Sequence, residues 1–163
     1  MALRAQILGH SFVKHLNNFI SRSPEHSFKL GLQEPALIQY SGLPGATVHH
    51  IRDQLEAVTD FDPHLIFLVI GTHDLSNSEN TPETVACSIL DLADTLLFFC
   101  GVTSVVVCHI FHRIPASKPV KYPVDIVWFN DRVNQTNHIL REKLHSDHPS
   151  KTYFWYCNGF WAP

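Results

Sequence analysis

A chain of 163 residues with 45% hydrophobic and 17% charged residues has the composition of one globular domain with a single hydrophobic core, and not of a disordered protein. The net charge of -3, with no cluster of Lys or Arg, argues against nucleic-acid binding through charge. The chain begins without a secretory signal and holds no apolar run that could span a bilayer, so we expect one cytoplasmic domain over residues 1–163, without a membrane span.

Five short apolar runs rich in β-branched residues alternate with longer helical stretches. This alternation predicts βαβ units, a parallel sheet and an α/β fold. The expected strands run from Ala5 to Leu8, Ala36 to Tyr40, Leu65 to Ile70, Ser104 to His109 and Tyr153 to Tyr156. The third and fourth runs are continuously apolar, as in strands covered by helices on both faces, so we expect them at the centre of the sheet.

Three helices are expected between these strands. The first covers about Thr47 to Val58, the second opens with Thr81 as its cap and ends at Gly101, and the third covers about Asp125 to His145. The segment from Phe111 to Pro123 contains three prolines and no helical period, which predicts a loop at the carboxyl end of the fourth strand. Open parallel sheets bind their ligands at that end.

Polar turns that contain glycine follow the first three strands. They are Gly9-His10-Ser11, the run from Ser41 to Thr47, and Gly71-Thr72-His73-Asp74. Right-handed crossovers bring all three turns to one edge of the sheet. A hydroxyl at a helix start, backbone N–H groups beside glycine and a polar side chain at the same point are what acyl transfer requires, so the spacing suits an esterase.

The same turns resemble the sequence blocks of the SGNH, or GDSL-like, hydrolase family. Gly9-His10-Ser11-Phe12 resembles the Gly-Asp-Ser block, with Ser11 as nucleophile, and Gly71-Thr72-His73-Asp74 resembles Gly-x-Asn-Asp. Gly45 resembles the glycine whose N–H joins that of Ser11 in the oxyanion hole, which His73 would complete. The resemblance implies a three-layer α/β/α fold with a five-stranded parallel sheet, and hydrolysis without a cofactor. It is nearest to the esterase-like domains of invertebrate proteins and LINE-type retrotransposons.

Two histidines depart from the family pattern. His10 replaces an Asp that is not itself catalytic, so we expect it to alter packing or local charge and to diverge from Ser11. His73 replaces the Asn that donates to the oxyanion; its imidazole can donate an N–H, but the ring is larger and its reach differs. Asp74 matches a residue that is mainly structural in the family. His10 and Asp74 are therefore secondary site candidates.

The family's final Asp-x-x-His block, which supplies the general base, does not occur in the sequence. The run from Asn158 to Pro163 resembles the approach to that block, and we expect either a truncated longer protein or a decayed copy. The run most similar to that block is Glu142-Lys143-Leu144-His145. It belongs to a helix expected on the flank of the sheet, far from Ser11, so it is a poor substitute for the general base. A couple between Ser11 and His73 stays open, although it would remove His73 from the oxyanion hole.

Structural interpretations compete with several of these assignments. Ser11 alone would suit a helix N-cap, Asp74 a cap of the following loop, and Gly45 a turn after Pro44. The four cysteines, which form no Cys-x-x-Cys pair, are expected to be buried free thiols: Cys87, Cys100, Cys108 and Cys157. The aromatic residues near the end of the chain are expected to pack in the core or at its edge: Phe154, Trp155, Phe160 and Trp161.

Metal and nucleotide sites are the weaker functional hypotheses. His109 and His112, with Cys108 or with His49 and His50, form no recognisable ligand pattern, so no metal is expected. Neither a Gly-x-x-x-x-Gly-Lys loop nor a Gly-x-Gly-x-x-Gly turn follows the first strand, which argues against a nucleotide-binding protein. Two hypotheses remain: a serine esterase that acts on a small-molecule ester or an acylated carbohydrate, and a non-catalytic binding module that keeps the same crevice.

Overall fold

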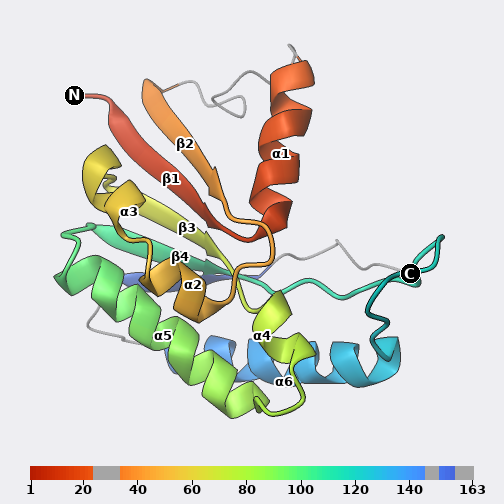
Figure 1. The fold of residues 1–163 in the computed structure, drawn as a ribbon. Coiled ribbons are helices and arrows are strands. Elements are labelled where there is room, and N and C mark those ends of the chain that lie inside the picture. Colours follow the sequence, from red (N-terminus) through yellow and green to blue (C-terminus); the bar gives the residue numbers. More distant parts are fainter. Residues whose placement is uncertain (24–33, 146–150, 157–163) are drawn as a thin grey trace.

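The computed structural model describes residues 1–23, 34–145 and 151–156. Its centre is a five-stranded parallel sheet with the order β2-β1-β3-β4-β5 (Figure 1). The strands are β1 (Leu3–Gly9), β2 (Ala36–Gly42), β3 (Leu65–Val69), β4 (Ser104–Cys108) and β5 (Thr152–Trp155). The α/β class and the five strands are therefore confirmed. Both continuously apolar strands, β3 and β4, have a neighbour on each side.

Helices cover the sheet from both sides and complete three layers (Figure 1). The helices are α1 (Ser11–Arg22), α2 (Val48–Arg52), α3 (Glu56–Phe61), α4 (Thr72–Ser76), α5 (Pro82–Phe98) and α6 (Ile126–Leu144). On one face, Val13 of α1 packs with Ile7, Val69 and Cys108 of the sheet. On the other, α2, α3, α5 and α6 share a larger core, in which Leu92 of α5 is completely buried.

Two helical regions differ from the expectation. The stretch expected as one helix from Thr47 to Val58 forms α2 and α3, separated by a turn. Both Ile51 and Val58 are buried in the larger core, so the apolar side of the stretch is preserved across the break. The short α4, expected only as a turn, begins after Gly71, whose φ of 112° suits glycine.

The loop between β4 and α6 is confirmed, because residues 109–125 form no helix or strand. Thr81 caps α5 as expected, with Pro82 at its first position. The part of the chain that the structure describes contains no helix long and apolar enough for a membrane span.

The cysteine expectation is wrong for Cys87, which is exposed on α5, and only partly right for Cys100, which is half-buried. Both lie on a helix or at its end, and there an apolar neighbourhood in sequence does not fix which side of the helix a residue occupies. Cys108 is buried as expected, whereas Cys157, Phe160 and Trp161 lie outside the described residues. Phe154 packs against the core, and Trp155 is half-exposed on the edge strand β5.

Candidate active site

The three turns after β1, β2 and β3 meet at the carboxyl edge of the sheet. The backbone N–H of Leu43 donates to the carbonyl of Gly9 over 2.8 Å, and that of His10 donates to the carbonyl of Val69 over 3.1 Å. Each bond joins the β1 turn to a neighbouring strand end. The close approach also requires glycine at position 9, because a Cβ there would lie 1.9 Å from the Val69 oxygen.

Ser11 is the first residue of α1 and is half-exposed at this edge. The N-cap of α1 is His10: its Nδ1 accepts a hydrogen bond from the backbone N–H of Phe12 over 3.2 Å. The interpretation of Ser11 as the N-cap is therefore wrong. Since the imidazole already serves α1, the Ser11 hydroxyl is not needed to cap the helix.

Gly45 lies in the exposed turn between β2 and α2. Its φ is 72°, a conformation that favours glycine, so its role in the turn is confirmed. Among the described residues other than its chain neighbours, no atom comes within 4 Å of the place where a Cβ would stand, which leaves the space above the turn open. A ligand can approach the backbone here.

His73 is the second residue of α4, and its ring meets the ring of His10 edge-on. The two ring centres are 5.7 Å apart and the planes are almost perpendicular, at 86°. His10 thus contacts His73, the residue expected in the oxyanion hole. The position of His10 next to Ser11 in the sequence does not predict this contact. The short α4 presents His73 toward the β1 turn.

The surroundings favour the neutral form of both imidazoles of this pair. Burial lowers the pKa of His10 to about 4, helped by the neighbouring His73 and by the Arg113 guanidinium. Burial also lowers the pKa of His73, Arg113 adds to the effect, and the Asp74 carboxylate opposes it. A neutral imidazole carries one N–H, and because Nδ1 of His10 accepts from Phe12, its proton lies on Nε2.

Asp74 joins the third turn to the second. Its two carboxylate oxygens both lie 3.2 Å from the backbone N–H of Val48, the first residue of α2. The expectation that Asp74 caps the following loop is wrong for its side chain, although its backbone carbonyl accepts from Asn80. Burial is the main cause that raises the pKa of Asp74, and the bond from Val48 opposes it.

Arg113 is a site residue that the sequence did not single out. It follows β4, and its guanidinium lies over the ring of Phe129 at 4.3 Å and donates to Ser76 Oγ at 2.9 Å. Asn130 holds its backbone N–H and carbonyl with two hydrogen bonds. The only signal in the sequence is a basic residue after a strand, in the loop at the ligand-binding end of the sheet.

Three histidines weighed in the sequence analysis lie away from the pair of His10 and His73. His145 is exposed at the end of α6, His109 is buried against Phe154 and Tyr156, and His112 contacts Asn134. Within residues 1–23, 34–145 and 151–156, no group of three or more His, Cys, Asp or Glu side chains is placed to hold a metal ion.

No protein-family model matches the sequence, and no curated protein matches it. Solved structures do match the fold. A GDSL-like lipase from Bacteroides thetaiotaomicron is 16% identical, with a TM-score of 0.64 over 93% of this chain and 66% of that one. A lipase/acylhydrolase from Enterococcus faecalis is 16% identical, with a TM-score of 0.58 over 92% and 74%. An acetylxylan esterase from Geobacillus stearothermophilus is 12% identical, with a TM-score of 0.54 over 87% and 72%.

These neighbours share the three-layer fold of GDSL-like lipases and acylhydrolases with this chain. The chain spans about two thirds of the length of the Bacteroides lipase. At this level of identity the likeness shows the fold, and it assigns no role to any residue.

Proposed function

We propose that this chain is an SGNH-type serine hydrolase domain of the esterase class, with Ser11 as its nucleophile. The observation that carries the proposal is the meeting of the three turns, which brings Ser11, Gly45 and His73 to one edge of the sheet. Backbone hydrogen bonds from Leu43 to Gly9 and from His10 to Val69 hold the first turn to its neighbours. The fold shared with GDSL-like lipases supports the same proposal.

The proposed reaction is acyl transfer through an acyl-enzyme. The hydroxyl oxygen of Ser11 attacks the ester carbonyl while a base takes its proton, the departing alkoxide receives that proton and leaves as the alcohol, and water then releases the acid and restores the Ser11 hydroxyl. The backbone N–H groups of Ser11 and Gly45 hold the oxyanion, with one N–H from the neutral imidazole of His73. The substrate is a small-molecule ester; an acylated carbohydrate is one candidate, because one structural neighbour is an acetylxylan esterase.

The proton of Ser11 needs an acceptor in this reaction. Nδ1 of His10 is occupied by the N–H of Phe12, and His73 would have to leave the oxyanion position to act as the base. This observation favours a second candidate function, a non-catalytic module that binds a ligand in the same crevice. The two candidates predict different behaviour of the Ser11 hydroxyl.

A fluorophosphonate probe and p-nitrophenyl acetate test the hydroxyl directly. The esterase proposal expects labelling and turnover in the wild type and a loss of about 10³-fold or more in Ser11→Ala. Ser21→Ala is the matched control, because Ser21 lies exposed on the same helix and donates to the carbonyl of Asn17. Equal background in the wild type and in Ser11→Ala would reject the esterase and leave the binding module.

A further inference from the structure

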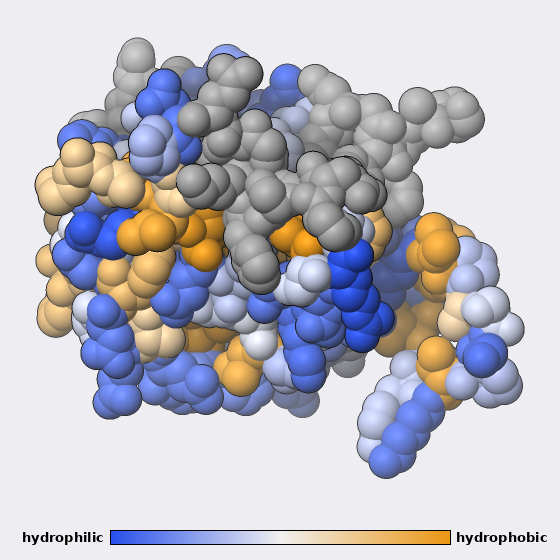
Figure 2. Space-filling view, turned by 90° about the horizontal axis from the view of Figure 1, so that it is seen from above, coloured by the Kyte–Doolittle hydropathy of each residue, from blue (hydrophilic) through white to orange (hydrophobic). Residues whose placement is uncertain are grey.

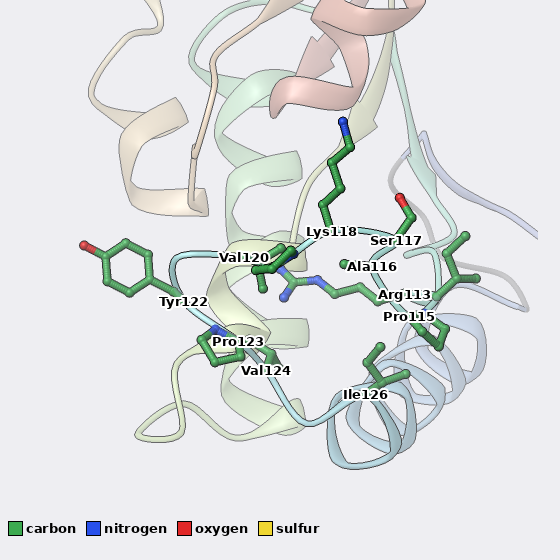
Figure 3. A pocket seen from close by; sticks show the side chains of 12 residues that line it. Arg113, Pro115, Ala116, Ser117, Lys118, Val120, Tyr122, Pro123, Val124 and Ile126 are labelled. Atoms are coloured by element: carbon green, nitrogen blue, oxygen red, sulfur yellow. The ribbon is translucent and has the colours of Figure 1, made fainter.

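The loop that leaves β4 forms a cavity of about 820 Å³, lined by residues from Arg113 to Ile126 (Figure 3). Apolar side chains dominate its lining: Ile114, Pro115, Val120, Pro123, Val124 and Ile126. Ile114 is 72% exposed and Val120 is 53% exposed. Figure 2 shows hydrophobic residues among hydrophilic ones on the part that projects at the right, where Figure 1 places this loop. The cavity can therefore cover an apolar group of a ligand.

The same segment is positively charged although the whole chain is not. Residues 111–124 include Arg113, Lys118 and Lys121 but no Asp or Glu, whereas the net charge of the chain is -3. Asp125, the acidic residue next in sequence, accepts a hydrogen bond from the backbone N–H of Trp128 at the start of α6. The local charge favours an anionic ligand.

The positively charged side chain of Arg113 extends into the cavity. Figure 3 shows its side chain extending into the space that the loop encloses, while Lys118 points away toward α1. The stack on Phe129 and the bond to Ser76 fix the guanidinium. Its hydrogen bonds to residues within the described ranges use one of its five N–H donors, so several remain to grip a carboxylate or phosphate.

The cavity adjoins the candidate active site through α4. Ser76, which accepts from Arg113, follows His73 by one helical turn, so both side chains lie on the same side of α4. The Arg113 charge also acts on the imidazoles of His10 and His73. A molecule that contacts Arg113 is thus beside the residues proposed to hold the oxyanion.

We infer that this cavity binds an amphiphilic anion, in which an apolar chain lies against the loop and a carboxylate or phosphate group pairs with Arg113. The inference deepens the proposed function and rests on it for the reaction: the ester substrate carries this anionic group, and Arg113 determines specificity for it. Binding itself does not depend on catalysis.

Calorimetric titration with hexanoate, hexyl phosphate and neutral hexanamide tests the inference on the intact chain. The wild type is expected to bind at least one of the two anions about tenfold more tightly than hexanamide, and the tighter of the two identifies the headgroup. Arg113→Met, which keeps an apolar stem against Phe129, is expected to lose that preference. Lys143→Met, a change of the same kind on an exposed side chain near the end of α6 that does not line the cavity, is expected to retain it.

Equal affinity for the anions and hexanamide in the wild type, or an unchanged preference in Arg113→Met, would overturn the inference. Arg113→Lys keeps a positive charge and is expected to retain part of the preference, so a folding defect in Arg113→Met leaves the test intact. Anion binding that requires Arg113, without Ser11-dependent turnover, rejects the esterase alone. Turnover that requires Ser11, without anion preference, rejects this inference alone.

Discussion

His10 shows how one residue can serve both a helix and a site. Its Nδ1 caps α1 by accepting from Phe12, in a position where Ser, Thr, Asp or Asn is usual. Only the neutral ring can accept a hydrogen bond, and a protonated ring would lie next to His73 and near the positive charge of Arg113. The cap therefore depends on the protonation state of a residue that is only 8% exposed.

Stability is expected to fall as the pH is lowered from about 7 to about 4. The pKa of His10 is 6.5 when unperturbed and about 4 in the folded chain, so the unfolded state binds more protons between these values. His10 contributes its full stabilisation above pH 6.5 and loses it as the pH falls toward 4, on the order of 3 kcal/mol in total. Urea unfolding at a series of pH values measures this dependence.

His10→Asn separates the titration from the cap. Asn is a good N-cap acceptor that does not titrate in this range, so the variant should keep α1 capped and lose much of the pH dependence. His73, whose pKa is also lowered, leaves a smaller dependence in place. A pH dependence as steep as that of the wild type would show that His10 is not the group responsible.

At the scale of the elements, side chains of one helix bond the backbone of a segment that precedes it in the chain. Asp74 of α4 bonds the first N–H of α2, and Asn130 of α6 holds the backbone of Arg113. These bonds connect the helix starts and the loop that surround the candidate site. The position of Gly45 relative to His73 thus depends on a contact between α2 and α4.

Asp74→Ala is expected to lower the free energy of unfolding by about 1–2 kcal/mol, because the N–H of Val48 loses its acceptor. Asp74→Asn keeps one acceptor oxygen for the N–H of Val48. It also removes a buried carboxylate, and burial disfavours the charged form, as the raised pKa of Asp74 indicates. The loss in free energy of unfolding should therefore be much smaller than for Asp74→Ala. Urea unfolding at pH 7 compares the two variants. Equal losses would mean that the bond to Val48 does not stabilise the fold.

At the scale of the whole molecule, α5 connects most of the larger core. Leu92 is completely buried among residues of the sheet and of other helices. Phe98, at the end of the same helix, is 77% exposed. The effects of removing a buried and an exposed apolar side chain can therefore be compared within one helix.

Leu92→Ala is expected to lower the free energy of unfolding by about 3 kcal/mol, through lost burial and the cavity left behind. Phe98→Ala should change it by less than about 0.5 kcal/mol, because little buried surface is lost. Denaturant titration followed by circular dichroism measures both variants. Similar losses in the two would contradict the assignment of the core to this side of α5.

Local patterns in the sequence are enough to predict the class of fold and the places where the turns fall. Continuous apolar runs such as Leu65–Val69 need helices on both faces, which requires parallel strands joined by crossovers. That connectivity carries the ends of β1, β2 and β3 to one edge, so the neighbourhood of Ser11, Gly45 and His73 follows from local pattern and chain order. Each of these signals is contained in a few consecutive residues.

The folded structure is needed to see which contacts the side chains at that edge make. It capped α1 with His10, set His10 against His73, joined Asp74 to Val48, and brought Arg113 beside α4. Most of these contacts join segments far apart in the chain, and hydrogen bonds and ring contacts depend on differences of a few ångströms. Periodicity shows which face of a strand is buried, but not the distance between two side chains on different elements.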